Sequence, residues 1–377
     1  VRPTPTATIS GTATVCRGAS SPNVTFTNPQ AIPVTVTYNI NGSSSQTINI
    51  GANSSANVPA PTGTAGTFTY NLVSIVYQDA PGCSNSISGS ATITVRPTPT
   101  ATISGTTTVC QDAASPLIRF TNPQNLPVTV IYNINGSGSH SLNIPASSSL
   151  TVSAPTDVSG TFVYSLVSVA YQGSPDCSNP ITGTATIAIN PAPDPVIIGP
   201  DNVCQHATNP INYSTPSVPG NTYSWSVTLG TISGPSTGNS VNVIWNTPGT
   251  GTLQVTETIT ATGCSKTTPA YTVTVNPGPP TDAPVFVSGA ANICRNGTLN
   301  LDVSDVATAI EYIWDFSWVP GTNNATTTTS EISIDLTGLA PGTYTVTVAG
   351  SNGCGTGPWM TPAHSFNIND IPDLAPL

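Results

Sequence analysis

Residues 33–50 read PVTVTYNINGSSSQTINI and decide the fold class. In the first half of this stretch every second residue is apolar, and Thr or Asn fills the positions between. A period of two is typical of a half-buried β-strand. Asn41-Gly42 then gives a turn signal. The same pattern returns in residues 127–144, so it is a repeated unit of the chain.

Further strands are predicted at residues 66–78 and 90–95, and no window combines helical periodicity with helix caps. Units of about 90 residues with about seven short strands and polar turns favour an antiparallel sandwich. The predicted fold is therefore all-β, a tandem array of four Ig-like/PKD-like antiparallel β-sandwiches.

The repeats divide the chain. Residues 1–94 align without a gap on residues 95–188, and about two-thirds of the positions are identical. Proline-rich stretches at 96–100, 190–195 and 276–284 read as short, stiff linkers. The predicted domains are repeat 1 (1–95), repeat 2 (96–190), repeat 3 (191–277) and repeat 4 (278–369). Residues 370–377 are expected to be a linker to a further repeat, which would make the chain a window from a longer array.

Each repeat carries one early and one late cysteine. The early series is Cys16, Cys110, Cys204 and Cys294, and the late series is Cys83, Cys177, Cys264 and Cys354. Regular cysteines in a Thr-rich chain with a single Lys predict disulfides and an oxidising compartment. No CxxC pair supports a zinc site.

Two pairing schemes are open. One bridge per repeat gives Cys16–Cys83, Cys110–Cys177, Cys204–Cys264 and Cys294–Cys354. In a standard Ig order, however, the early and late cysteines lie at opposite ends of a sandwich. A strand spans about 17–20 Å, whereas a disulfide needs Cα atoms within about 7 Å. Bridges between neighbouring repeats give Cys16–Cys177, Cys110–Cys264 and Cys204–Cys354, and they leave Cys83 and Cys294 for further repeats.

The composition excludes several partners. Only 6% of the residues are charged, the formal charge is −10 and the pI is about 4.2. Nucleic acids and anionic membrane surfaces need clustered Lys and Arg, which are lacking. No apolar run approaches about 20 residues, so no membrane insertion is expected.

No catalytic motif occurs, and we expect no enzymatic activity, no cofactor and no metal. Asp302, Asp305, Glu311 and Asp315 have oxygen ligands for Ca²⁺, but their spacing is not that of an EF-hand and favours a solvated acidic surface. His140 is expected to be an exposed turn residue and His364 to serve in packing, and His206 has no second metal ligand nearby. Trp225 and Trp314 are expected in the core. Trp245, Trp318 and Trp359 are the candidates for stacking on sugar rings.

Repeats 3 and 4 resemble a known family. Repeat 4 has YIWDF at 312–316 and APGTYTVTVAGSNGC at 340–354, and repeat 3 has YSWSV at 223–227 and VTETITATGC at 255–264. These motifs resemble the polycystic-kidney-disease (PKD) type of Ig-like domain. The early Cys before a β-run with a late Gly-Cys is similar to the Ig-like repeats of giant Bacteroidetes surface proteins. The gliding-motility adhesins exported by the type IX system are members of that group.

Together these features predict a non-enzymatic extracellular segment at the cell surface, acting as a stiff stalk or filament of a bacterial adhesin. One alternative is a self-assembling fibre subunit, with residues 369–377 as a candidate donor strand. Another is a carbohydrate-binding accessory module of a secreted hydrolase. The expected partners are neighbouring repeats of a longer chain or fibre and surface polysaccharide, with no nucleic acid and no membrane.

Overall fold

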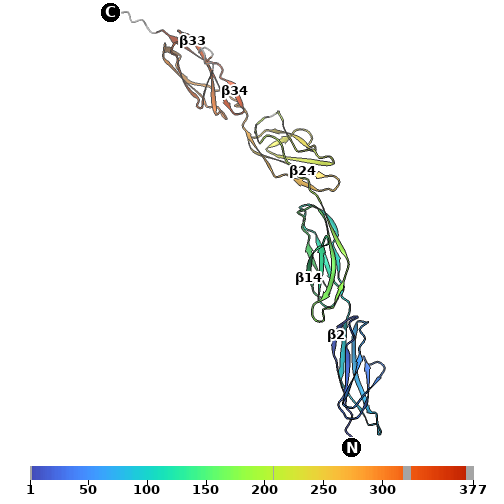
Figure 1. Ribbon diagram of the computed structural model, residues 1–377. Coiled ribbons are helices and arrows are strands. Elements are labelled where there is room, and N and C mark those ends of the chain that lie inside the picture. The colour runs from blue at the N-terminus through green and yellow to red at the C-terminus, as the bar shows by residue number, and fades with distance from the viewer. Residues whose placement is uncertain (1, 207, 317–323, 371–377) are drawn as a thin grey trace, which may run out of the picture. The chain divides into compact units, whose positions relative to one another are not determined.

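The computed structural model describes residues 2–206, 208–316 and 324–370 (Figure 1). Among these residues the secondary structure consists of β-strands and turns, without a helix. This confirms the all-β prediction. The chain divides into two compact units, Val1–Pro191 and Ala192–Leu377. Each unit contains two sandwiches, and each sandwich packs a small sheet against a larger one. No described residue belongs to a helix that could cross a membrane.

The first sandwich has a three-stranded sheet in the order β1-β3-β6 and a six-stranded sheet in the order β2-β9-β7-β4-β5, in which β8 also pairs with β7. Its strands are β1 (Thr8–Ser10), β2 (Ala13–Cys16), β3 (Asn23–Asn28), β4 (Val34–Ile40), β5 (Gln46–Ile50), β6 (Ser54–Pro59), β7 (Gly66–Tyr77), β8 (Ser84–Ser86) and β9 (Ser90–Arg96).

The second sandwich repeats this topology, with sheets β10-β12-β15 and β11-β18-β16-β13-β14, and β17 pairs with β16. Its strands are β10 (Thr102–Ser104), β11 (Thr107–Cys110), β12 (Leu117–Asn122), β13 (Val128–Ile134), β14 (Ser137–Ile144), β15 (Ser148–Ser153), β16 (Gly160–Tyr171), β17 (Ser178–Pro180) and β18 (Thr184–Asn190).

The third sandwich has sheets β20-β23-β22 and β19-β26-β24-β21, and β25 pairs with β24. Its strands are β19 (Asn202–Cys204), β20 (Ile211–Ser214), β21 (Asn221–Thr228), β22 (Gly230–Ile232), β23 (Ser240–Trp245), β24 (Gly249–Ile259), β25 (Ser265–Thr267) and β26 (Tyr271–Asn276).

The fourth sandwich has sheets β27-β29-β32 and β28-β35-β33-β30-β31, and β34 pairs with β33. Its strands are β27 (Phe286–Gly289), β28 (Asn292–Cys294), β29 (Thr298–Val303), β30 (Glu311–Asp315), β31 (Asn324–Thr327), β32 (Glu331–Asp335), β33 (Gly342–Asn352), β34 (Gly355–Trp359) and β35 (His364–Asn369).

Each sandwich departs once from antiparallel pairing. The short strand that carries the early cysteine runs parallel to the last strand of its own sandwich, as β2 does to β9 and β19 to β26. The expected sandwiches were antiparallel throughout. The extra strand arises because the chain crosses from the small sheet to the large one after β1, and so brings the early cysteine beside the end of the last strand.

Each sandwich has its own apolar core. A large aromatic side chain lies inside each core, on β4, β13, β21 and β30, namely Tyr38, Tyr132, Trp225 and Trp314. Trp225 and Trp314 are 5% and 0% exposed, which confirms their predicted core positions. Their indole N–H groups donate to Gly238 O and Thr327 Oγ1, so their burial leaves no polar group unpaired.

Candidate functional site: the junctions between repeats

The early cysteine lies where a sandwich ends. In the parallel ladder Cys16 is opposite Arg96, and Cys204 is opposite Asn276. Arg96 and Asn276 are the last residues of β9 and β26, so the linker to the next sandwich leaves beside each early cysteine. The early cysteine therefore faces the sandwich that follows.

The late cysteine lies at the other end of its sandwich. β7 begins at Gly66, opposite Val95 and hence near Cys16, and runs to Tyr77. Eleven further residues at about 3.3 Å each give about 36 Å between the two ends of this strand. Tyr77 N donates to Cys83 O, which keeps Cys83 at the far end. A Cys16–Cys83 bridge is therefore excluded by distance.

The observed disulfides join successive sandwiches. Cys16 is bonded to Cys177 with an S–S distance of 2.08 Å and a Cα–Cα distance of 5.5 Å. Cys204 is bonded to Cys354 with an S–S distance of 2.02 Å and a Cα–Cα distance of 5.6 Å. For these four cysteines the structure has the pairing between neighbouring repeats, and the alternative with one bridge per repeat is wrong.

The remaining four cysteines differ from one another. Cys83 and Cys294 are exposed free thiols, as the pairing between neighbouring repeats leaves them, and their bonding to further repeats stays a prediction. Neither Cys110 nor Cys264 is a free thiol. Their pairing with each other, which the inter-repeat scheme requires, stays a prediction.

An arginine accompanies the first junction. Arg96 Nη1 donates to Gly173 O at 2.9 Å and to Pro175 O at 2.7 Å, both in the loop that carries Cys177. The guanidinium lies 5.9 Å from the ring centre of Tyr171. Burial raises the pKa of Tyr171, and the charge of Arg96 opposes that rise. Arg96 thus fixes the loop that presents Cys177 to its neighbour Cys16.

Arg2 makes the equivalent contacts to the first sandwich. Its Nη1 pairs with Asp79 Oδ1 at 2.8 Å, and its Nη2 donates to Ala80 O at 3.3 Å. Asp79 and Ala80 lie in the loop before Cys83, as Gly173 and Pro175 lie in the loop before Cys177. The same device therefore holds both late-cysteine loops of this unit.

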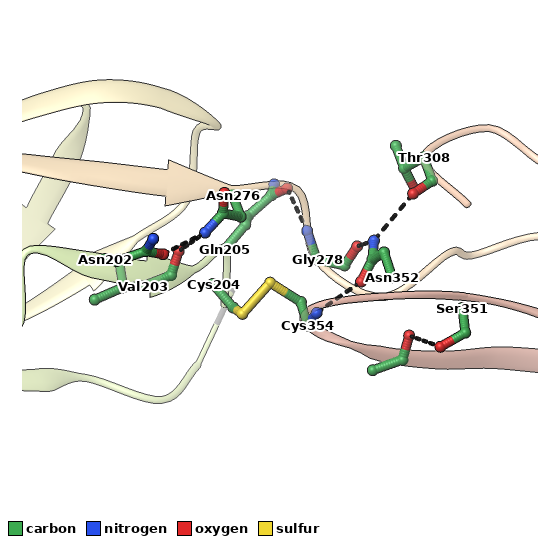
Figure 2. The surroundings of a disulfide bond; sticks show 11 residues. Asn202, Val203, Cys204, Gln205, Asn276, Gly278, Thr308, Ser351, Asn352 and Cys354 are labelled. Atoms are coloured by element: carbon green, nitrogen blue, oxygen red, sulfur yellow. Dashed lines mark hydrogen bonds between the residues drawn. A yellow bond between two sulfur atoms is a disulfide. The ribbon is translucent and has the colours of Figure 1, made fainter. Parts of the chain in front are cut away.

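The junction in the second unit uses an asparagine instead (Figure 2). Asn352 Nδ2 donates to Gly278 O at 2.8 Å in the linker and to Thr308 O at 3.2 Å, while its Oδ1 accepts from Cys354 N at 2.8 Å. On the other side of the bridge, Gln205 N donates to Asn276 O at 2.8 Å. The linker and the late-cysteine loop are thus tied to each other as well as to Cys204.

A cavity of about 850 Å³ lies beside the Cys204–Cys354 bridge. Its lining includes the apolar Val203, Ile211 and Ile310 and the polar Asn276 and Asn352. The linker here spans residues 277–285, whereas the linker after β9 spans only residues 97–101.

The other predicted sites are not brought together. Trp245 is 1% exposed, with its indole N–H donating to Tyr213 OH at 3.1 Å, so its assignment as a sugar-stacking residue is wrong. Trp359 is 39% exposed and remains available, and Trp318 lies outside the described residues. Within the described ranges no three His, Cys, Asp or Glu side chains group closely enough to hold a metal ion.

Two of the three histidines, His140 and His364, stack on aromatic rings. His140 lies within β14 and stacks on Tyr132 with ring centres 5.0 Å apart, so it is a strand residue. His364 stacks on Phe286, with the ring centres 4.3 Å apart.

The arginine and asparagine contacts at the junctions were missed by the sequence analysis. The arginine of each VRPTPT motif was the signal that could have indicated them, because it stands at the same place before both late-cysteine loops.

Comparisons with solved structures give distant likenesses. An adhesin, described as Ca²⁺-stabilized, that helps an Antarctic bacterium to reach out and bind ice is 17% identical, with 98% of this chain and 100% of that chain covered and a TM-score of 0.37. Invasin, a bacterial integrin-binding protein, is 15% identical, with 97% and 79% covered and a TM-score of 0.26. The human desmocollin-1 ectodomain is 13% identical, with 97% and 81% covered and a TM-score of 0.26.

The search of the curated proteins gives no match. The family comparison gives two matches to one domain model, at residues 190–275 and 279–362. These ranges correspond to the third and fourth sandwiches, where the YxW strand and the Gly-Cys turn pointed to the same family. The third and fourth sandwiches therefore each match the model of a PKD-like domain.

Proposed function

We propose that this chain is a non-enzymatic, extracellular segment that acts as a stiff stalk or filament of a bacterial surface adhesin. The observation that supports this role is the placement of the Cys16–Cys177 and Cys204–Cys354 bridges, each of which joins one sandwich to the next. A bridge inside a sandwich would stabilise only that sandwich. A bridge across a junction also limits bending and sliding between repeats, which is what a stalk requires.

The linkers support the same role. Residues 96–100 contain two prolines, whose fixed φ stiffens the connection. Arg96 adds hydrogen bonds from the end of β9 to the loop of the next sandwich. The prolines, the hydrogen bonds of Arg96 and the disulfide thus each restrain this short linker.

Structural disulfides such as Cys16–Cys177 and Cys204–Cys354 are typical of proteins outside the cytoplasm. We assign the chain to the cell surface, in an array like those of the giant Bacteroidetes proteins that the type IX system exports. The support for this lineage is the recurrence of an early Cys after a short strand and a late Cys in the loop after the longest strand.

Electron microscopy of the source cells, with an antibody against residues 1–190, tests the proposal. Label along filaments attached to the cell is the expected result. Label confined to soluble protein in the medium would contradict the stalk and support an accessory module of a secreted hydrolase.

A fibre subunit is a second candidate, and the exposed Cys83 and Cys294 thiols favour it. Their counterparts in the neighbouring sandwiches, Cys177 and Cys204, form bridges across junctions. Repeats of the same kind, in a longer chain or a fibre, are the partners we propose for them. Ladders of oligomers on non-reducing gels that disappear in a Cys83→Ser variant would support the fibre. The tail suggested as a donor strand lies mostly outside the described residues.

Surface polysaccharide is a further candidate partner, because Trp359 is partly exposed on β34. A change in tryptophan fluorescence with added polysaccharide that is lost in Trp359→Ala would support binding. Unchanged fluorescence across a panel of surface polysaccharides would remove this candidate.

A further inference from the structure

The two bridges between sandwiches also close two long loops in the covalent chain. Cys16 and Cys177 are 161 residues apart in the sequence, and Cys204 and Cys354, whose bridge is drawn in Figure 2, are 150 residues apart. When the two ends of the chain are pulled apart, tension follows the shortest covalent connection between them. That connection passes through each S–S bond, so the pull does not stretch the residues inside the two loops.

The closed loops contain most of the strands. β3 to β16 lie between Cys16 and Cys177, and β20 to β33 lie between Cys204 and Cys354. The buried aromatic side chain at the centre of each core stands on one of these strands. A pull on the ends therefore cannot unravel the enclosed strands while the two bridges are intact.

Three stretches of the chain remain on the load-bearing route. They are residues 1–16, 177–204 and 354–377, and they hold 16, 28 and 24 residues. At about 3.4 Å for each extended residue, the three stretches together reach about 230 Å, whereas all 377 residues would reach about 1,300 Å. The bridged chain can therefore be stretched to only about a fifth of the length that its sequence would allow.

The last strands of the second and fourth sandwiches, β18 and β35, lie on this route and are paired on both sides. β18 pairs at six positions with β16 and at four with β11. β35 pairs at five positions with β33 and at three with β28. The hydrogen bonds of a ladder run across the strands, so a pull along a strand loads them together rather than one after another. These two strands thus resist being drawn out of their sheets.

We propose that the Cys16–Cys177 and Cys204–Cys354 bridges carry tensile load past the sandwiches, so that the chain is nearly inextensible while these cysteines are oxidised. Without the bridges, a pull would unfold one sandwich after another and lengthen the chain each time. This load-bearing role goes beyond the proposed stalk and does not depend on it, because the extension of the purified chain is measurable whatever the chain does on a cell.

Single-molecule force spectroscopy of the full chain tests the proposal. The chain is held by tags fused to its two ends, because attachment through thiols would also use Cys83 and Cys294. We expect the stretched length of the oxidised chain to stay near about 230 Å. Adding tris(2-carboxyethyl)phosphine to the same molecules should increase it about fivefold. Because each molecule is folded and tethered before it is reduced, the comparison does not depend on a variant that folds.

Two variants separate the bridges from the other thiols. Cys16→Ser opens the first loop alone and should lengthen the stretched chain by at least about 400 Å, since a bond between Cys110 and Cys264 would remove only part of the gain. Cys83→Ser is the matched control, because it removes an exposed thiol that lies outside both bridges, and it should stretch as the wild type does.

An oxidised wild type that stretches beyond about 300 Å would overturn the proposal, because at least one sandwich would then have unfolded under load. A length that reduction leaves unchanged would overturn it as well. Failure of the stalk proposal is a separate outcome, since protein found only in the medium would leave the measured lengths as they are.

Discussion

Arg96 shows how one side chain can position a disulfide. It stands opposite Cys16 in the parallel ladder, and its two hydrogen bonds reach the loop of Cys177. A planar guanidinium can donate to two carbonyl groups in one fixed orientation, because its N–H donors are arranged as a rigid fork. The loop is therefore held in place independently of the S–S bond.

Replacing Arg96 by Ala should destabilise the first unit by about 1–2 kcal/mol, because two hydrogen bonds from a charged donor are lost at a partly exposed site. Reoxidation of the reduced chain should also form the Cys16–Cys177 bond more slowly. Urea unfolding and timed thiol trapping measure the two effects. Arg119→Ala is the control, since Arg119 is exposed on β12 and should change neither. Equal behaviour of the two variants would contradict the positioning role.

The hydroxyl of Tyr213 makes the free energy of unfolding of the second unit depend on pH in the alkaline range. Burial raises the pKa of Tyr213 to about 12, and its hydroxyl donates to Pro200 O and accepts from Trp245 Nε1. The unfolded chain releases this proton near pH 10. The folded chain holds the proton more tightly, so the stabilisation is complete below about pH 10 and is lost as the pH rises through about 12.

The free energy of unfolding of the second unit should therefore fall by about 2–3 kcal/mol between pH 10 and 12 through this group, at about 1.4 kcal/mol per pKa unit. Tyr213→Phe cannot titrate and should lose less over the same range. Urea unfolding at several alkaline pH values compares them, and parallel pH profiles would contradict the account.

The hairpin of β4 and β5 depends on backbone conformation at its turn. Asn41 and Gly42 both have positive φ, at 54° and 74°, as a tight hairpin turn requires. A Cβ at Gly42 would meet no atom within 4 Å, so the cost of a side chain there is conformational alone.

Gly42→Ala should cost about 1–2 kcal/mol, the usual penalty for a left-handed L-residue. Gly63→Ala is the control, because Gly63 has no positive φ and equally open surroundings. Urea unfolding should show a loss for the first variant and none for the second. Similar losses would mean that the turn conformation is not the cause.

Local patterns predicted the strands but not their partners. Alternation in residues 33–50 and the Asn-Gly signal correctly located β4, β5 and their turn. The parallel pairing of β2 with β9 joins segments far apart in sequence. A strand of four residues is too short for its sequence pattern to predict which strand it pairs with. Trp245 was misplaced for a similar reason, because its burial depends on contacts with Tyr213 in another strand.

The sequence alone argued against a disulfide inside one sandwich but did not establish which cysteines pair. Strand length alone made a bridge inside one sandwich difficult, since the cysteines lie at opposite ends. Choosing the other scheme required knowing that the early cysteine ends a strand parallel to the last one. That arrangement places Cys16 beside Arg96 and at the exit of the linker. The hydrogen bonds of Arg96 go to backbone carbonyl groups, so only the recurrence of the arginine in each VRPTPT motif could have indicated them.

At the scale of the whole molecule, the bridges should couple the stability of successive sandwiches. Cys16→Ser should lower the free energy of unfolding of the first unit by about 2–4 kcal/mol, because the bridge closes a long loop in the unfolded chain. The matched control is Cys83→Ser, which removes an exposed thiol without a partner in the described structure. Calorimetry under non-reducing conditions compares them, and an equal effect of both changes would contradict the coupling.

In each unit a cysteine of one sandwich is bonded to a cysteine of the next. Mass spectrometry of a non-reduced proteolytic digest of the native chain tests it most directly, with free thiols blocked beforehand. We predict peptides that link Cys16 to Cys177, Cys110 to Cys264 and Cys204 to Cys354. Peptides that link Cys16 to Cys83 and Cys204 to Cys264 would contradict it.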